Sequence, residues 1–256
     1  SVFSDRNHNI WLGLDNGIDF IAFNNAIKHI NPTSMNDGGG YAVAIHNNHF
    51  YFGLSNGLYQ VPLEGIKDLS YTRNDCRLIK EGQIWGLYVV NNNLLAGTDE
   101  GFFEVRDNIA LPVSKSAGFW TFQPLQNLHQ SPMVVAGNYH GVRIFENSGQ
   151  HYIVKGAIEN FTESARIIVI DNNNTIWVPH PYRGIYKIQS DITGEYHIKL
   201  YAAANGLPSA NNNHVYKVKN RIVIATEKGV YEYNSRTDAF ESSQYFKVIF
   251  GLGGVR

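Results

Sequence analysis

A short phrase recurs six times along this chain and constrains its fold more than any other feature. The phrase is a hydrophobic pair, a small residue, a few turn residues, and then a glycine followed by an apolar residue, as in residues 11–18. Consecutive copies lie 40, 44, 40, 43 and 45 residues apart, measured between their second glycines, which are Gly17, Gly57, Gly101, Gly141, Gly184 and Gly229. A period of this length is typical of repeat architectures, including propeller blades of four strands.

One repeat can be divided into strands by its turn residues. In the second copy, apolar runs at 41–45, 50–53 and 58–61 are separated by short segments of Asn, Ser and Gly. Short apolar runs bounded by such residues indicate strands rather than helices. The sequence therefore predicts an all-β fold, a β-propeller of six repeat units, each a four-stranded antiparallel blade.

The expected units fill the chain as one β-propeller segment over residues 1–256. Their approximate bounds are 1–35, 36–78, 79–114, 115–156, 157–202 and 203–249, and residues 250–256 are expected to begin a further unit. Because both ends of the chain look like parts of a repeat, we expect it to be a segment of a longer protein.

Charge and composition argue against several classes of partner. The net charge is −1, and no basic stripe is present that could neutralise a phosphate backbone, so we expect no nucleic-acid binding by this segment. Cys76 is the single cysteine, which excludes an internal disulfide framework and a cysteine-based zinc site. No stretch of about 18 apolar residues exists, so we expect no membrane insertion by this segment.

Two turns rich in Asp and Asn resemble fragments of calcium loops. They occupy residues 5–9 and 171–174. Both lack the spaced acidic ligands and the closing glutamate of a true calcium site, and hairpin turns explain their composition better. We therefore expect no metal site, and no motif in the sequence predicts a bound cofactor.

The order of strands in a blade predicts which residues share a face of the propeller. The first strand is innermost and its neighbours are antiparallel, so its start and the turn between the second and third strands lie together at the mouth of the central channel. Counting back six residues from the turn after each first strand places these residues at the mouth: Tyr41, Trp85, Trp120, Arg166 and His214. The turns on the same face add Tyr139, His140, His180 and Tyr182.

Aromatic rings and a guanidinium group around one axis suit ligands that have apolar faces and polar edges, such as sugars. We therefore predict that these nine residues bind a ligand. The alternative is that their large side chains only fill a tapering channel. The aromatic residues of the second strands are expected in the core, because they lie mid-strand beside small residues; they are Trp11, Tyr51 and Trp177.

Support for catalysis is weak in this sequence. Serines in the turns lack the context of a nucleophile elbow. The acidic residues of the mouth turns lie on different units, apart from the neighbours Asp99 and Glu100. We predict no catalytic residues. Two alternatives stay open, a propeller-fold polysaccharide lyase or glycosidase and a scaffold for protein interactions, because propellers host all three functions.

Residues 5–18 resemble the repeat of the two-component regulator propeller family, in which an Asp and a turn precede Asn-Ile-Trp-x-Gly and then Gly followed by an apolar residue. The resemblance covers all six units and is strongest in the first and fifth. The segment 206–209, Gly-Leu-Pro-Ser, also matches a lead-in common in that family. Units three, four and six have no aromatic residue at the Trp position, so their match rests on glycine spacing.

The resemblance implies the periplasmic sensor portion of a membrane-anchored regulator of glycan use, either a hybrid two-component protein or one with a triple-tyrosine module and a helix-turn-helix domain. It also implies a seven-bladed ring, of which this chain would be a fragment. The implied partners are an oligosaccharide or other small molecule, the neighbouring domains of the same regulator and, in a homodimer, a second copy. On this basis we expect a periplasmic ligand sensor without catalysis of its own.

Overall fold

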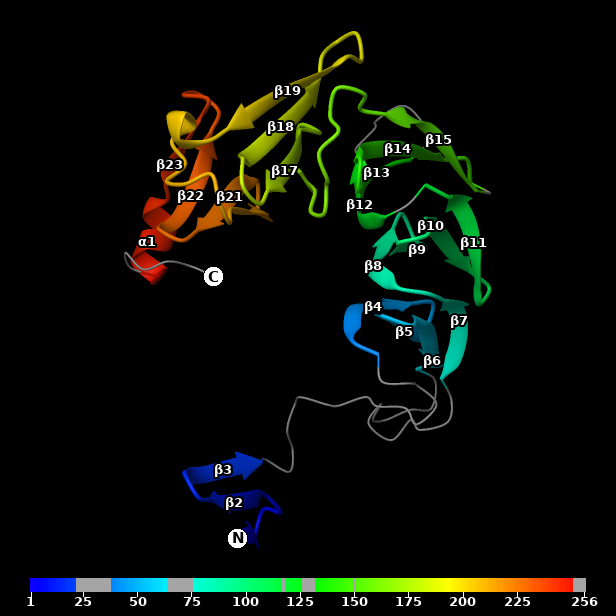
Figure 1. Ribbon diagram of the computed structural model, residues 1–256, viewed down its shortest axis with the longest axis vertical. Coiled ribbons are helices and arrows are strands. Elements are labelled where there is room, and N and C mark those ends of the chain that lie inside the picture. Colours follow the sequence, from blue (N-terminus) through cyan, green and yellow to red (C-terminus); the bar gives the residue numbers. More distant parts are fainter. Residues whose placement is uncertain (22–37, 64–75, 117, 126–131, 150, 251–256) are drawn as a thin grey trace.

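The computed structural model describes residues 1–21, 38–63, 76–116, 118–125, 132–149 and 151–250. These residues form six antiparallel sheets, one of three strands and five of four strands, in which strands adjacent in sequence are adjacent in the sheet. Figure 1 shows the four-stranded sheets following one another around an open arc, while the three-stranded sheet lies apart from them. The predicted all-β propeller fold with four-stranded antiparallel blades is confirmed.

The first sheet contains β1 (Val2–Ser4), β2 (Ile10–Leu14) and β3 (Gly17–Ile21). The next three sheets contain β4 (Gly40–His46), β5 (His49–Leu54), β6 (Gly57–Pro62) and β7 (Arg77–Glu81); β8 (Ile84–Val90), β9 (Asn93–Thr98), β10 (Phe102–Arg106) and β11 (Ile109–Ser114); β12 (Phe119–Leu125), β13 (Met133–Asn138), β14 (Gly141–Asn147) and β15 (Tyr152–Ala157). The last two contain β16 (Val169–Ile170), β17 (Ile176–His180), β18 (Gly184–Ser190) and β19 (Tyr196–Tyr201); β20 (His214–Val218), β21 (Arg221–Thr226), β22 (Gly229–Asn234) and β23 (Ala239–Ser242).

Two short helices accompany the last sheet. A 3-10 helix, η2 (Ala203–Asn205), precedes β20, and α1 (Gln244–Phe250) follows β23. The further unit expected at 250–256 lies outside the described residues, apart from the last residue of α1. Over the described ranges, no helix has both the length and the apolar character needed to cross a membrane.

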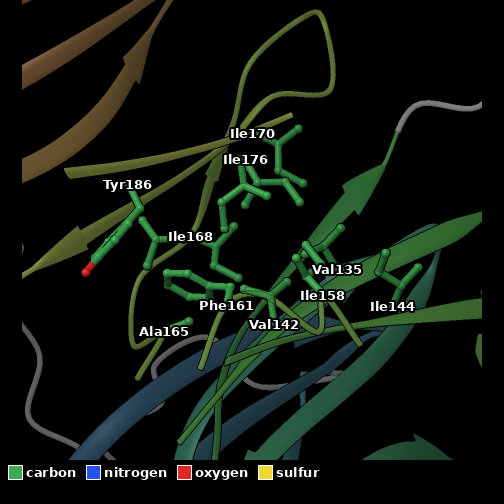
Figure 2. Close-up of a cluster of buried hydrophobic side chains, with 12 residues drawn as sticks. Val135, Val142, Ile144, Ile158, Phe161, Ala165, Ile168, Ile170, Ile176 and Tyr186 are labelled. Atoms are coloured by element: carbon green, nitrogen blue, oxygen red, sulfur yellow. The ribbon is translucent and has the colours of Figure 1, made fainter. Parts of the chain in front are cut away.

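The core of the protein lies between consecutive sheets. Figure 2 shows one such cluster, in which side chains of β13 and β14 meet those of the segment before β16 and of β17 and β18. Phe161 and Tyr186 pack edge to face there, with ring centroids 5.1 Å apart. Similar clusters around Ile84, Phe102 and Trp177 join the other neighbouring four-stranded sheets. Each fully buried large side chain contributes about 1.5–3 kcal/mol, so this packing fixes one sheet on the next.

The first glycine of the repeated phrase lets neighbouring sheets approach closely. A Cβ atom added to Gly137 in β13 would lie 2.0 Å from the carbonyl oxygen of Ala165, which leads into the next sheet. At Gly97 in β9, the added atom would lie 2.5 Å from the carbonyl oxygen of Phe119. A larger residue at either position would push two sheets apart, which explains the glycine in the phrase.

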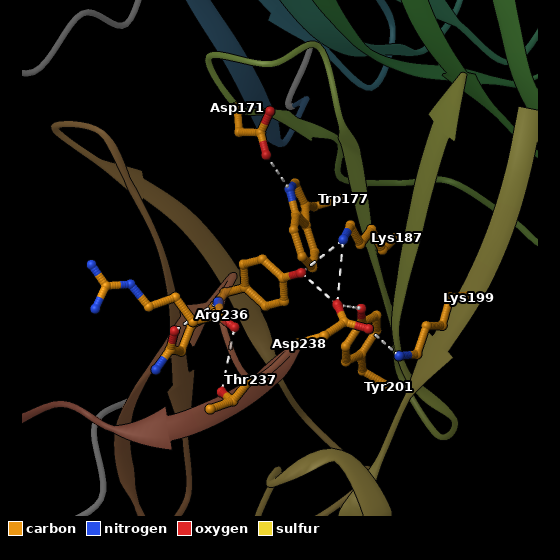
Figure 3. A network of polar contacts seen from close by, with 10 residues as sticks. Asp171, Trp177, Lys187, Lys199, Tyr201, Arg236, Thr237 and Asp238 are labelled. Atoms are coloured by element: carbon orange, nitrogen blue, oxygen red, sulfur yellow. Dashed lines mark hydrogen bonds and ion pairs between the residues drawn. The ribbon is translucent and has the colours of Figure 1, made fainter. Parts of the chain in front are cut away.

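An aspartate and a tryptophan of the repeat are partners in one hairpin. The carboxylate of Asp171 accepts two backbone N–H groups of its own turn, at 2.8 and 3.0 Å, and the indole N–H of Trp177 at 3.1 Å (Figure 3). Asp5 makes the same three bonds, the last from Trp11 at 3.1 Å. Side-chain hydrogen bonds from Asn9 and Trp11 lower the pKa of Asp5 to about 2. In both turns that resemble fragments of calcium loops, the hydrogen bonds of the hairpin therefore account for the aspartate carboxylate.

The predicted burial of the second-strand aromatic residues is confirmed in the four-stranded sheets and is wrong in the first sheet. Trp177 is fully buried and Tyr51 is 4% exposed, whereas Trp11 is 40% exposed. The β1–β3 sheet lies apart from the others (Figure 1), and the aromatic neighbour of Trp11 is Phe20 of the same sheet, 4.6 Å away between ring centroids. The position of an aromatic residue in the second strand thus predicts its burial only where a neighbouring sheet covers that strand.

A polar network joins the last two sheets at the end of β22 away from Gly229 (Figure 3). The carboxylate of Asp238 accepts hydrogen bonds from Lys199, Tyr201 and Tyr233. These three bonds hold the pKa of Asp238 well below its usual range, and the bond from Lys199 has the largest effect. Burial, followed by the hydrogen bond to Asp238, raises the pKa of Tyr201. The network therefore favours an ionised carboxylate beside neutral hydroxyl groups.

The two hairpin tryptophans should differ in their contribution to stability. We expect Trp177→Ala to lower the free energy of unfolding by about 3–5 kcal/mol, because it removes a fully buried ring. The matched change Trp11→Ala removes a ring that solvent already reaches and should cost less than half as much. Urea unfolding of both variants measures the difference, and equal losses would contradict this account of the core.

The Asp238 network should make stability depend on pH in the acid range. Because the folded-state pKa is depressed, the stabilisation is fully present above the ordinary aspartate value of 3.8 and is lost as the pH falls through the folded-state pKa. Asp238 has a φ of 49°, which asparagine also tolerates, so Asp238→Asn removes mainly the charge. Its side chain is 44% exposed, so we expect a loss of about 1 kcal/mol at pH 7.

Thermal unfolding of both proteins between pH 2 and pH 7 is the measurement. The difference in melting temperature between the original chain and Asp238→Asn should shrink as the pH falls. A difference that is constant over this range would show that the charge of Asp238 does not stabilise the fold.

Candidate ligand-binding site at the mouth face

Three inner strands begin with the same local irregularity, and each time the extra residue is aromatic. The pairing register shifts between residues 40 and 42 in β4, between 84 and 86 in β8, and between 119 and 121 in β12. The residues outside the ladder are Tyr41, Trp85 and Trp120. A β-bulge releases one residue from the alternation of a strand and re-aims its side chain, and bulges are frequent beside functional sites.

The bulged aromatic residues contact one another across three consecutive sheets. The ring centroids of Tyr41 and Trp85 are 5.4 Å apart, and those of Trp85 and Trp120 are 4.3 Å apart. Tyr139, from the β13–β14 turn, lies 5.4 Å from Trp120. Gly118 permits this contact, because its φ is 75° and a Cβ atom there would lie 2.0 Å from the Tyr139 ring. We call the face on which these inner strands begin the mouth face.

Arg166 continues this stack into the next sheet. Its guanidinium carbon lies 4.6 Å from the centroid of the Trp120 ring, within the range of cation–π attraction. Arg166 precedes β16 by three residues, and its position follows from its buried neighbour Ala165, whose N–H donates to the carbonyl of Asn138 at 3.0 Å. The acidic side chain nearest to it in sequence, Glu163, forms its ion pairs with other residues.

The tryptophans fall into two pairs according to their hydrogen bonds. Trp11 and Trp177 each donate to the aspartate of their own hairpin at 3.1 Å. The indole N–H groups of Trp85 and Trp120 are buried and have no hydrogen-bond partner within the described ranges. A buried donor without a partner costs about 1–3 kcal/mol, so two of them in one stack require an explanation beyond packing.

A cavity of about 510 Å³ adjoins the stack at Arg166. Its polar and aromatic lining comes from the loop before β16, the β17–β18 turn and the start of β20, and includes Arg166, His180, Tyr182, Asn212, Asn213 and His214. Ile167, Pro179 and Pro181 supply an apolar wall. An apolar wall with a few polar groups, at this volume, is typical of a small-molecule site.

Hydrogen bonds fix the β17–β18 side of the cavity. The Nδ1 atom of His180 accepts the backbone N–H of Tyr182 at 3.1 Å, and its Nε2 atom lies 3.4 Å from a carboxylate oxygen of Glu163. Arg183 donates to the other oxygen of Glu163 at 2.6 Å. The turn is therefore tied to the loop that carries Arg166, and the charge of Glu163 is engaged by neighbouring groups.

The segment before β20 forms the opposite side. The N–H of Asn212 donates to the carbonyl of Pro181 at 3.1 Å, and its side-chain amide donates to Glu227 at 3.2 Å. Asn212 has a φ of 54°, a conformation that asparagine tolerates better than most residues. Asn213 is 4% exposed, and its Oδ1 atom is buried with no hydrogen-bond partner among the residues that the structure describes. A residue that lines the cavity therefore carries an acceptor that the described residues leave without a partner.

The structure brings the predicted residues together in two adjoining groups. The stack contains Tyr41, Trp85, Trp120, Tyr139 and Arg166, and the cavity contains Arg166, His180, Tyr182 and His214. His140 belongs to neither group; it is exposed, and its backbone N–H donates to the side chain of Asn138 at 2.7 Å. Ligand binding by any of these residues stays a prediction.

Sequence reasoning missed two residues of this region, Asn213 and Glu163. The run of three asparagines at 211–213 was a usable signal, because asparagine at the lead-in to a strand marks an irregular backbone. No sequence pattern indicated Glu163, because its importance depends on its contacts with His180 and Arg183 at the β17–β18 turn.

Solved structures similar to this chain include propellers. The extracellular domain of the hybrid two component system BT4673 from B. thetaiotaomicron superposes with a TM-score of 0.50 and 18% sequence identity, covering 95% of this chain and 42% of that chain. The WD40 β-propeller domain of Doa1 gives a TM-score of 0.54, with 13% identity and coverage of 94% and 77%. Virginiamycin B lyase from Staphylococcus aureus gives 0.52, with 12% identity and coverage of 82% and 71%.

The chain spans about two fifths of the length of the BT4673 domain. No protein-family model and no curated protein sequence matches this chain. Among its structural neighbours is the extracellular domain of a hybrid two component system, the class of protein that its repeated motif resembles. At these sequence identities the comparisons establish the fold, and the chain is a β-propeller segment.

Proposed function

We propose that this chain is the ligand-sensing propeller segment of a membrane-anchored regulator and that it binds an oligosaccharide at the mouth face. The observation that carries the proposal is the convergence of three bulged aromatic residues and Arg166 beside a cavity of about 510 Å³. Packing alone does not require a bulge at the same point of three strands, or two indole N–H groups that the described residues leave without partners.

The roles of the rings follow from their surroundings. Trp120 is contacted by Trp85, Tyr139 and Arg166, so its faces are largely covered by protein and it holds the guanidinium group in place. Tyr182 is 76% exposed beside the cavity and can offer a ring face to the C–H face of a sugar. Imidazole and amide groups around the cavity can bond hydroxyl groups.

The regulatory part of the proposal is supported by the repeated motif and by the fold that this chain shares with an extracellular domain of a hybrid two component system. In that setting the segment would lie in the periplasm, beside other domains of the same regulator and, in a homodimer, beside a second copy. A ligand can signal only if it binds one arrangement of these parts better than another. Contacts from two neighbouring sheets, β16–β19 and β20–β23, to one ligand would give such a preference.

A catalytic propeller is the second candidate, and one observation favours it. His180 lies in the cavity with Glu163 3.4 Å from its Nε2 atom, which is an arrangement that can support proton transfer. The same fold also occurs in virginiamycin B lyase. A sensor leaves its ligand intact, so analysis of the ligand after incubation separates the two functions.

Binding should depend on the mouth face. We expect at least one fragment of a panel of neutral and acidic oligosaccharides to raise the melting temperature by mass action, with the dissociation constant then measured by calorimetry. Tyr182→Ala truncates an exposed ring and should weaken binding about three- to tenfold with an unchanged fold. Trp85→Ala and Trp120→Ala should abolish binding, because they dismantle the stack.

Ile192→Ala is the matched control, since Ile192 is fully exposed in the β18–β19 turn at the other end of the sheet. It should leave the dissociation constant unchanged. Unaltered binding in the Trp85 and Trp120 variants would rule out the mouth face as the site. Cleavage of the bound fragment would favour the enzyme.

A further inference from the structure

We infer that the cavity beside Arg166 recognises a carboxylate group, so that the ligand is an acidic sugar of the uronic acid class rather than a neutral one; this inference rests on the proposed function.

The guanidinium group of Arg166 is charged, is restrained by the Trp120 ring and keeps its N–H donors free for a ligand. Its contact with the Trp120 ring, 4.6 Å from the guanidinium carbon to the ring centroid, restrains the group without using its N–H donors. The described residues supply Arg166 with neither an ion-pair partner nor a side-chain hydrogen bond. A planar fork of five donors matches the two oxygens of a carboxylate, and an ordered fork loses less freedom when it binds.

Two acidic side chains beside the cavity already bond other groups. Glu163 is bound by Arg183 at 2.6 Å and lies 3.4 Å from His180, and Glu227 accepts the side-chain amide of Asn212 at 3.2 Å. None of the described residues that line the cavity is acidic. The cavity therefore has one fixed positive charge with no internal partner, and an anion entering it gains an attraction that a neutral ligand does not.

The remaining groups of the site suit a sugar ring that carries the carboxylate. Ile167 and Pro181 form an apolar surface beside Arg166, and Tyr182 adds an exposed ring. His214, on the other side, can bond the hydroxyl groups of a ring placed against that surface. A small inorganic anion would use Arg166 alone and leave these contacts unmade. The combination of a charge, an apolar surface and polar groups points to a uronate.

Calorimetry on the 256-residue chain tests this with matched probes. The acidic probes are short oligogalacturonides and glucuronate-containing disaccharides, and the neutral probes are the methyl esters of the same compounds. We expect an acidic probe to bind at least tenfold more tightly than its ester, with affinity that falls as salt rises. Acetate should bind weakly, since it has the carboxylate but no sugar ring to contact the apolar surface.

Variants of Arg166 give the second measurement. Arg166→Gln should reduce the affinity for the acidic probe about tenfold or more and the affinity for the ester by a smaller factor, so that most of the preference is lost. Arg166→Lys keeps the charge but loses the fork, and should give an intermediate affinity. Arg236→Gln, an exposed arginine in the β22–β23 turn, is the matched control and should change neither affinity.

The outcomes separate the inference from the function on which it rests. Equal affinity for acid and ester, or an acid preference that survives Arg166→Gln, overturns the carboxylate assignment and leaves a neutral-sugar sensor standing. Binding of acetate as tight as that of the oligogalacturonide overturns the uronate assignment in favour of a general anion site. An absence of binding by every acidic and neutral probe contradicts both proposals.

Discussion

The burial of each sheet against its neighbour is the constraint on which the rest of this structure depends. The clusters of apolar side chains lie between consecutive four-stranded sheets, and the backbone of one sheet approaches the next so closely that Gly137 has no room for a Cβ atom. Because the sheets pack in sequence order, the starts of successive inner strands lie side by side. Residues far apart in sequence, such as Trp85 and Trp120, therefore meet at one face.

Tryptophan occurs in two different settings in this fold, in hairpins and in bulges. In the hairpins, Asp5 and Asp171 accept the indole N–H groups of Trp11 and Trp177, so ring and turn support each other. In the bulges, Trp85 and Trp120 have buried N–H groups without partners in the described part of the chain. The Asp–Trp pairs of the hairpins are determined by the conformation of the turn. The contact between Trp85 and Trp120 is determined by the packing of two sheets, and Trp120 also contacts the guanidinium group of Arg166.

Much of the fold and part of the site could be predicted from the sequence, because both follow from local chain geometry. The spacing of the glycines fixes the blades, and counting back from the turns places Tyr41, Trp85 and Trp120 at strand starts. The counting could not show that these residues are bulged, since a bulge depends on the pairing of two strands. It also could not show that Arg166 precedes its strand, or that His140 stands clear of the site while its neighbour Tyr139 packs on Trp120.

The exposure of Trp11 has the same origin, because burial of a strand residue is decided by the neighbouring sheet, and no pattern within the strand records that neighbour. The sequence also could not predict the charge network at Asp238, because the partners Lys187, Lys199 and Tyr201 come from a different sheet. Sequence pattern determines the blade, and contacts between blades determine the chemistry at its edges.

The indole N–H signals of the four tryptophans test the central claim most directly. They can be assigned in a proton–nitrogen correlation spectrum by replacing each tryptophan with phenylalanine. On titration with an acidic oligosaccharide that binds, the account predicts that the signals of Trp85 and Trp120 move, while those of Trp11 and Trp177, which are bonded to aspartates, stay in place. A binding ligand that leaves the Trp85 and Trp120 signals unchanged would contradict a site at the mouth face.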